Sequence, residues 1–390
     1  MIPAADIVIV GGGPVGATLA LALQHQGIAA TLLEAREQGV SHQDQRALAL
    51  SYGSRMILER LGLWQQLEPT ATAINTIHIS QRGSFGRTLL QAKDHGQPAL
   101  GYVLAYGALS QALDHALHDF PEVNKLYGAE ATHIEPGADA ATASFRQADA
   151  LQTLSAKLII LADGGRSLGD VPGLKRETKH YGHDALVSKV QCELAHDNIA
   201  YERFTPAGPV ALLPNGERDF SLVWTGKEAE VSQLLALEDE EFLSRLHDHF
   251  GDRVGRFLKV GKRLSFPLKL SYLNPVTAPH LVVIGNAAQT MHPVAGQGFN
   301  VGLRDAWELA DTLAATDPVD WGGEQMLQAY QRTRRTDTKA GVLFTDFLVN
   351  IFSNDIAGLS GLRAAGLGLL DVVKPAKNYL VGKMSFGAHG

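Results

Sequence analysis

The sequence predicts an α/β (α+β) fold in which a parallel sheet is interleaved with a mixed or antiparallel sheet and is followed by C-terminal helices. Three observations support this prediction. Continuous apolar runs typical of buried strands each end in a glycine-rich turn, at residues 6–10, 158–161 and 281–284. Stretches that alternate between apolar and polar residues, at 74–91 and 185–225, indicate antiparallel strands between those runs. A helical and unusually apolar pattern runs from residue 338 to the end.

Composition limits the class of protein. The 390 residues provide enough core for one large domain or two interleaved ones. The net charge of -7 argues against a nucleic-acid partner, because phosphate binding requires clustered lysine and arginine. The single Cys192 excludes an internal disulfide and a cysteine-cluster metal site, which fits a reducing cytoplasm, and no metal is expected. Without a spanning apolar run or a signal-peptide pattern, we expect a soluble or peripheral protein.

The first apolar run leads directly into the glycine motif GGGPVG at 11–16. A helix rich in alanine and leucine follows, and a second strand, 30–33, ends at Glu34. Such glycines allow a tight turn and the close approach of a pyrophosphate, and an acid at the end of the second strand suits a ribose hydroxyl. The glycine motif alone would be a weak signal. With the strand, the helix and the acid in place, it predicts a Rossmann-like dinucleotide-binding unit rather than a chance turn.

The next elements are a polar loop, 38–46, and helices at about 54–67 and 107–118. Arg46 is either a solvated loop cation or a contact to the phosphates of the cofactor. Gln111 lies on the polar side of the second helix. Strands at 129–134 and 143–146 return the chain to the apolar run 158–161.

Two further strand ends complete the predicted ligand edge. One carries Asp163 and Gly164, and the other opens the stretch 285–305. The helix that follows has Leu303, Ala306, Ala310 and Leu313 on one face, with Asp305 among the polar residues elsewhere. Its N-terminus would suit a group that gains negative charge. Three strand ends at one edge suggest an extended dinucleotide, and because a second glycine fingerprint is missing, FAD fits better than NAD as the resident cofactor.

These motifs, in this order and spacing, resemble the aromatic-hydroxylase class of FAD monooxygenases over nearly the whole chain. Three stretches are similar to the ubiquinone-biosynthesis hydroxylases in particular: DQRALALS at 44–51, ERFTPAGPVALLP at 202–214 and GNAAQTMHPVAGQGFNVGLRD at 285–305. Asn286 stands where most of the class has Asp, and this Asn is typical of the 2-polyprenyl-6-methoxyphenol hydroxylase branch. An amide keeps an acceptor for a ribityl hydroxyl.

The resemblance implies roles for individual residues. Glycines of the first motif would pack the pyrophosphate, the acid at 34 would hold the adenosine ribose, and the later strand ends would meet phosphate, ribityl groups and the flavin ring. The implied FAD contacts are Gly11, Gly13, Pro14, Val15, Gly16, Glu34, Ala35, Arg46, Gln111, Asp163, Gly164, Asn286, Gly298, Phe299 and Asn300. The implied catalytic loop comprises His292, Pro293, Gly296, Gln297 and Gly298. His292 is either a base or a residue that fixes the loop by hydrogen bonding.

The resemblance also implies the reaction. NAD(P)H, or another donor, reduces the flavin transiently, dioxygen is the co-substrate, and a flavin hydroperoxide hydroxylates the ring of a prenylated phenol. The cofactor carries this chemistry, so the chain need only bind, orient and exclude water. The implied domains are an FAD-binding domain at 1–73, 99–183 and 275–335, a substrate domain at 74–98 and 184–274, and a C-terminal helical region at 336–390.

Other interpretations stay open. A small soluble aromatic substrate, or a non-redox binding protein of the same fold, would use the same elements. The apolar C-terminal region predicts core packing or an oligomer contact ahead of a membrane-surface role, although Lys374, Lys377 and Lys383 follow it. We therefore expect a cytoplasmic protein and leave open an oligomer, attachment to the inner face of the membrane, and other quinone-biosynthesis proteins as partners.

Overall fold

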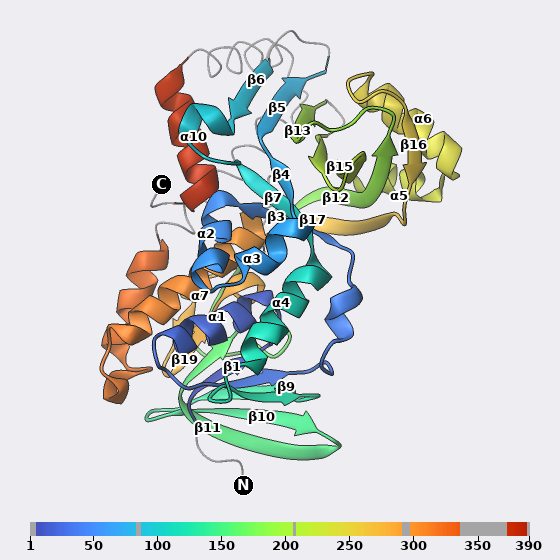
Figure 1. The fold of residues 1–390 in the computed structure, drawn as a ribbon. Helices are drawn as coiled ribbons and strands as arrows, with labels where there is room; N and C mark the ends of the chain where they lie inside the picture. Colours follow the sequence, from blue (N-terminus) through green and yellow to red (C-terminus); the bar gives the residue numbers. More distant parts are fainter. Residues whose placement is uncertain (1–4, 83–86, 206–207, 291–296, 336–372, 388–390) are drawn as a thin grey trace.

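The computed structural model describes residues 5–82, 87–205, 208–290, 297–335 and 373–387 (Figure 1). The fold is mixed α/β, as predicted, and contains an eight-stranded, a nine-stranded and a three-stranded sheet within these residues.

The eight-stranded sheet carries the predicted ligand edge. Its main path is β18 (Thr277–Ala278), β19 (Leu281–Val283), β11 (Ala150–Leu161), β1 (Ala5–Val10), β2 (Thr31–Glu34) and β8 (Asn124–Tyr127). From β19 to β8 all neighbours are parallel. The three strands that end in glycine-rich turns, β1, β11 and β19, are therefore adjacent and end at the same edge, as the sequence predicts.

The two faces of this sheet are covered differently. The helices α1 (Pro14–His25), α4 (Tyr106–His118) and α7 (Gln297–Ala314) lie together on one face (Figure 1). Ile7 and Ile9 of β1 pack into that helical core, whereas Val8 and Val10 point to the other face. There β9 (Glu130–Pro136) and β10 (Ala141–Gln147), paired antiparallel beside β11, contribute apolar side chains such as Phe145. Because side chains alternate between the two faces of a strand, β1 contributes to the apolar cores on both sides of the sheet.

Helix α7 buries the predicted apolar face, since Leu303, Ala306 and Leu313 are all fully buried. Asp305, which the helical pattern places off that apolar face, is also buried. Its side chain is 4% exposed, and it forms an ion pair with the similarly buried Arg334, with 2.5 Å between Oδ1 and Nη2. Helical spacing could not predict this, because the compensating charge comes from a distant segment.

The nine-stranded sheet lies beside the first. Its path is β20 (Gln289–Thr290), β17 (Leu264–Leu273), β12 (Arg176–Cys192), β15 (Asp219–Lys227), β14 (Val210–Pro214), β13 (Ile199–Phe204), β5 (Thr76–Gln81) and β6 (Arg87–Gln91), and β16 (Phe257–Val260) also pairs with β12. The helices α5 (Glu228–Ala236) and α6 (Asp239–Phe250) cover one of its faces (Figure 1). The proposed domain boundary at 183/184 falls inside β12, at a register shift between His180 and Asp184.

The three-stranded sheet connects the other two. It consists of β3 (Ala47–Ser51), β7 (Gly101–Ala105) and β4 (Thr72–Ile74). Leu50 and Leu104 on one side pack into the helical core. Val103 and Ile74, on the other side, pack against Ala200 of β13 in the nine-stranded sheet.

The helix predicted at 54–67 is two helices, α2 (Tyr52–Arg60) and α3 (Trp64–Leu67). Gly62 between them has a φ of 74°, a left-handed conformation that ends a helix. The short 3₁₀ segments are Val40–Gln43, Glu68–Thr70, Ala92–His95, Gly285–Ala287 and Pro318–Asp320.

The C-terminal region is described only in its last part. Helix α10 (Lys374–Phe386) carries the three predicted lysines, and its Val381 packs with Leu90 and Leu100 near β6 (Figure 1). The apolar segment predicted between 338 and 372 lies outside the described residues. Among the helices that are described, none is long and apolar enough to cross a membrane.

Candidate functional site

The first strand end forms a glycine cradle that other residues could not fill. A Cβ added to Gly16 would lie 1.9 Å from the carbonyl oxygen of Gly11. One added to Gly11, whose φ is 105°, would lie 2.6 Å from Cα of Asp163. Gly13 is different, because a Cβ there would come no closer than 3.7 Å to another heavy atom. Gly11 and Gly16 are therefore needed for packing, whereas Gly13 at the helix start leaves room for a Cβ, which would be in ordinary contact with Tyr106 and Arg36.

The helix that begins in this cradle has a free N-terminus. Pro14 occupies its first position, where a missing N–H costs no helical hydrogen bond, and no side-chain hydrogen bond caps α1. Val15 is half-buried and lies between the strand ends, close to Gly285 and Gly302 of the third one. The backbone N–H groups of this first turn form a ready site for a pyrophosphate.

The carboxylate of Glu34, at the end of β2, accepts hydrogen bonds from Gly12 and Arg36. Its Oε2 accepts a hydrogen bond from the backbone N–H of Gly12 at 2.7 Å, and its Oε1 accepts one from Nε of Arg36 at 2.7 Å. Burial opposes ionisation of Glu34, but the hydrogen bonds from Arg36 and Gly12 outweigh burial and lower its pKa. Ala35 beside it is half-buried. The acid predicted to hold the adenosine ribose thus also fixes the glycine turn.

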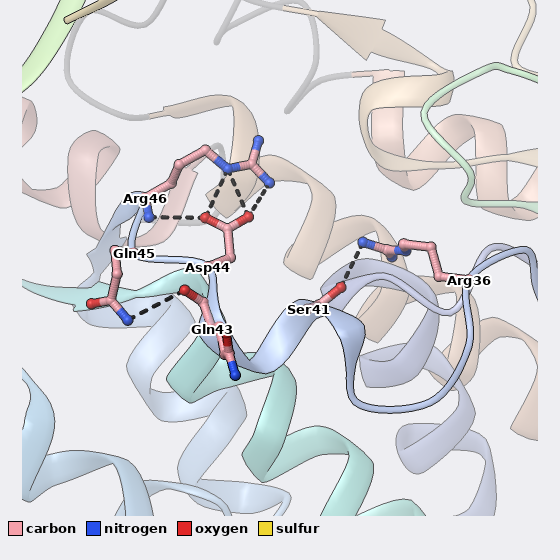
Figure 2. Close-up of polar contacts among 6 residues, drawn as sticks. All are labelled: Arg36, Ser41, Gln43, Asp44, Gln45 and Arg46. Carbon is pink, nitrogen blue, oxygen red and sulfur yellow. Dashed lines mark hydrogen bonds and ion pairs between the residues drawn. The ribbon is translucent and has the colours of Figure 1, made fainter. Parts of the chain in front are cut away.

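Two arginine contacts order the loop after β2. Nη1 of Arg36 donates to Oγ of Ser41 at 2.7 Å, and Nη2 of Arg46 donates to Oδ2 of Asp44 at 2.6 Å (Figure 2). The hydrogen bond to Asp44 raises the pKa of Arg46 despite burial, and Arg46 also stacks 5.0 Å from the ring centre of Tyr106. Gln111, on α4, is exposed. Arg46 is therefore paired, not a free solvated cation, although its guanidinium remains on the surface of the loop.

The second strand end is closed by Asp163. Its Oδ1 accepts from the N–H of Gly165 at 2.8 Å and its Oδ2 from the N–H of Ser167 at 2.7 Å. Gly164 is exposed and has a φ of 76°. A Cβ added there would have no heavy atom of the described residues within 4 Å. Asp163 thus shapes the turn, and the open side of the turn is at Gly164.

The third strand end is tied to α7. Oδ2 of Asp305 accepts from the backbone N–H of Gly285 at 3.0 Å, and Nε of Arg334 donates to Oδ1 of Asp305 at 2.6 Å. Close packing here requires Gly302, where a Cβ would lie 2.8 Å from Cγ2 of Val15. Asn286 alone points outward, because its neighbours Gly285 and Ala287 are buried and it is exposed.

Two residues at the start of α7 have different surroundings: Asn300 is buried and bonded to β3, whereas Gly298 has few neighbours among the described residues. Asn300 is 1% exposed, accepts from the N–H of Ser51 at 2.8 Å and donates to the carbonyl of Ala49 at 2.9 Å, so it fastens α7 to β3. A Cβ at Gly298 would meet no atom of the described residues within 4 Å. Phe299 packs partly against the helical core.

The rest of the predicted catalytic loop is less completely described. His292, Pro293 and Gly296 lie outside the described residues, and only the backbone of Gln297 is described, as the first residue of α7. Every assignment of a cofactor or catalytic role to an individual residue stays a prediction.

Sequence reasoning missed the supports of this edge. Arg36 and Arg334 were not singled out, although Arg36 follows the ribose acid by only two positions and could have been suspected. Ser51 lies at the end of the DQRALALS stretch, but its partner Asn300 is 249 residues away, and no local signal connects the two.

The residues fit FAD. An uncapped helix N-terminus, glycines at 13, 164 and 298 that have room for a Cβ among the described residues, and the exposed Asn286 follow one another along three adjacent strand ends. Such an edge is where open α/β sheets bind extended dinucleotides. Within the described part of the chain, no group of three or more His, Cys, Asp or Glu side chains is placed to hold a metal ion.

Comparison with solved structures shows the same fold. The p-nitrophenol 4-monooxygenase of Pseudomonas putida superposes with a TM-score of 0.81 at 19% identity, covering 99% of both chains. A Klebsiella pneumoniae HpxO variant complexed with FAD superposes with a TM-score of 0.76 at 17% identity, covering 99% of this chain and 100% of the other.

Comparison with known sequences shows the family. The FAD binding domain family matches residues 4–345. A ubiquinone hydroxylase of Rhodospirillum rubrum is 36% identical over 96% of this chain and 87% of its own length. The 3-demethoxyubiquinol 3-hydroxylase of Escherichia coli is 30% identical over 93% of each chain. The resemblance seen in the sequence is confirmed, and the chain belongs to the FAD-binding monooxygenase family that includes these ubiquinone hydroxylases.

Proposed function

We propose that this protein is an FAD-dependent monooxygenase that hydroxylates the aromatic ring of a polyprenylated phenol in ubiquinone biosynthesis. The observation that carries the proposal is the 36% identity to a ubiquinone hydroxylase over 96% of the chain. The continuous ligand edge at β1, β11 and β19 supports it, because an extended dinucleotide fits there.

Each part of the edge has a proposed task. The first turn of α1 binds the pyrophosphate, Glu34 meets the adenosine ribose, and Asn286 and Gly164 line the path of the ribityl chain. FAD, when bound, supplies the oxygen-transfer chemistry. The backbone of residues 297–299 at the start of α7 orients the flavin ring and stabilises negative charge on it, because a helix N-terminus is positively polarised.

The remaining reactants and surroundings are also proposals. NAD(P)H serves as the transient reductant and dioxygen as the co-substrate. The chain divides into an FAD-binding domain, a substrate domain and a C-terminal region at the boundaries stated above. The prenyl tail brings the substrate from a membrane surface, and the lysines of α10 would favour contact with anionic lipid there. This predicts a cytoplasmic, peripheral protein.

A second candidate is hydroxylation of a small soluble aromatic compound. It is favoured by the fold shared with p-nitrophenol 4-monooxygenase. A low identity supports the fold alone, so we rank this activity second. A non-redox binding protein of the same fold would purify colourless, which separates it from both enzymes.

The test is a visible spectrum of the purified protein, followed by anaerobic addition of NADPH with and without a 2-polyprenylphenol. We expect flavin absorbance that bleaches faster with the phenol and, after air is admitted, a hydroxylated product. Bleaching accelerated by p-nitrophenol and not by the prenylated phenol would support the second candidate. A colourless protein that FAD cannot reconstitute would overturn the enzyme proposal.

A further inference from the structure

Strand β13 of the nine-stranded sheet places one acid opposite its charged and aromatic neighbours. Tyr201 packs into the core under α5 and α6, and Arg203 stacks 5.9 Å from the ring centre of Phe250 on α6. Because side chains alternate along a strand, Glu202 points to the other face, together with Ala200. Ala200 packs on the three-stranded sheet, so this face is turned toward the FAD-binding part of the molecule.

The surroundings of Glu202 on that face are apolar. Its register partners are Ile79 on β5 and Ala211 on β14, and Ala211 is in turn paired with Val223 on β15. All four side chains are only partly exposed. We call these four residues the Glu202 face. An aromatic ring or an isoprene unit would bury well against its three apolar members.

Among the residues that the structure describes, none is paired with Glu202. No hydrogen bond or ion pair joins its carboxyl to any residue that the structure describes, and burial alone raises its pKa to about 7. Elsewhere in the chain, buried acids such as Asp305 are paired. An unpaired acid in an apolar setting is costly to the fold, and such groups concentrate at functional sites.

The Glu202 face is connected to the flavin end of the cofactor edge by a short series of contacts. Ala200 packs against Val103 of β7, which pairs with Ala49 of β3. The carbonyl of Ala49 accepts a hydrogen bond from Asn300 in the first turn of α7, two residues after Gly298. The described parts of the three stretches that resemble ubiquinone hydroxylases, 44–51, 202–214 and 285–305, are therefore linked through the three-stranded sheet.

We propose that Glu202 recognises the phenolic hydroxyl of the substrate, its carboxylate accepting the O–H hydrogen bond while the ring lies on the Glu202 face. This inference rests on the proposed function and assigns a residue to its substrate. The carboxylate holds the phenolic proton while the electron pair of that oxygen moves into the ring, which makes a ring carbon more nucleophilic. Dioxygen, reduced by two electrons from the flavin, supplies one oxygen atom to that carbon as its O–O bond breaks. The second oxygen leaves as water and takes up the proton that the attacked carbon loses, and Glu202 returns the held proton to the phenolic oxygen.

The experiment compares wild type with Glu202→Gln, which keeps the size of the side chain but cannot take the proton. The probes are a 2-prenylphenol with one isoprene unit and its methyl ether, which lacks the O–H donor. Binding is followed through the flavin spectrum between pH 6 and 8.5. Wild type should bind the phenol at least about tenfold more tightly than the ether above pH 7, a typical difference for a hydrogen bond to a charged group.

In Glu202→Gln the pH dependence of this preference should disappear and the preference itself should shrink, because the amide oxygen accepts only a weaker, neutral hydrogen bond and cannot take the proton. FAD content and the rate of flavin reduction by NADPH without phenol should stay at wild-type values, and the yield of hydroxylated product per NADPH should fall at least about tenfold. The matched control is Glu217→Gln, since Glu217 is an exposed acid in the turn after β14.

Two outcomes would contradict the inference in different ways. If Glu202→Gln keeps the preference for phenol over ether and its product yield, the role of Glu202 is wrong and the proposed function stands. If wild type contains FAD but responds to neither probe, the prenylated-phenol substrate fails and Glu202 loses its role with it.

Discussion

Acids at the cofactor edge are hydrogen-bonded to neighbouring residues, whereas the acid on the Glu202 face has no such bond within the described residues. Asp163 has both carboxylate oxygens bonded to backbone N–H groups, and Asp305 is bonded to Gly285 and Arg334. Glu202 has no such bond within the described residues, and burial is the only cause of its raised pKa. The described residues of the edge are therefore bonded to one another without a ligand, whereas none of the described residues bonds to the acid of the Glu202 face. Substitutions of edge residues should lower the stability of the fold, and an apolar substitution of Glu202 should raise that stability.

The largest expected effect is at the base of the cradle. Gly16→Val places a side chain where even a Cβ would lie 1.9 Å from the carbonyl oxygen of Gly11, so α1 cannot pack on β1. We expect a loss of more than about 3 kcal/mol in the free energy of unfolding and no retained FAD. Urea unfolding and flavin content after gel filtration measure both.

The control for that substitution is Gly13→Ala. A Cβ at Gly13 would come no closer than 3.7 Å to another atom, so the unfolding midpoint without FAD should change little. FAD affinity should still fall, because the methyl group would narrow the space at the start of α1, where we propose that the pyrophosphate binds. Equal destabilisation by the two variants would contradict the distinction between packed and open glycines.

A second large effect is expected from Asp305→Ala. It removes the partner of Arg334, whose side chain is 3% exposed, and leaves a buried guanidinium together with the N–H of Gly285 without this acceptor. Breaking such a buried pair costs about 3–5 kcal/mol. Thermal unfolding of the holoenzyme checks this, and Asp311→Ala, at an exposed acid on the same helix, is the control. A loss no greater than the control's would mean that the pair does not hold the third strand end.

Much of this edge could be predicted from the sequence, because its signals are local. Each of the three buried strands runs directly into its own turn, and parallel strands bring their ends to one edge. Period 3.6 also identified the buried face of α7 through Leu303 and Leu313. These elements need no distant partner to be recognised.

The supports of the edge could not be predicted, because their partners are remote in sequence. Asp305 has polar neighbours on its helix, and its partners lie elsewhere in the chain, at Gly285, 20 residues earlier, and at Arg334, 29 residues later. The side chain of Asn300, one of the implied FAD contacts, bonds to Ser51 of β3, 249 residues earlier in the chain, and its contact with the cofactor stays a prediction. For Glu202, alternation tells which residues share a face, but which face meets the cofactor part depends on the contact of Ala200 with Val103.

The smallest of the three stability effects is also the one with the opposite sign. In the folded chain the pKa of Glu202 is raised to about 7 from 4.5, so as pH rises from about 4.5 to 7 the unfolded chain releases a proton that the folded chain retains. Glu202 therefore destabilises the fold increasingly over that window and constantly above it. Glu202→Leu removes this penalty, and the gain should be near zero at pH 4.5 and at most roughly 3 kcal/mol at pH 8. Urea unfolding at the two pH values measures the difference, and Glu217→Leu should show less than about 0.5 kcal/mol at either. If Glu202→Leu were less stable than wild type at pH 8, the carboxylate would have a stabilising partner, and the contrast between the bonded edge and the Glu202 face would no longer hold.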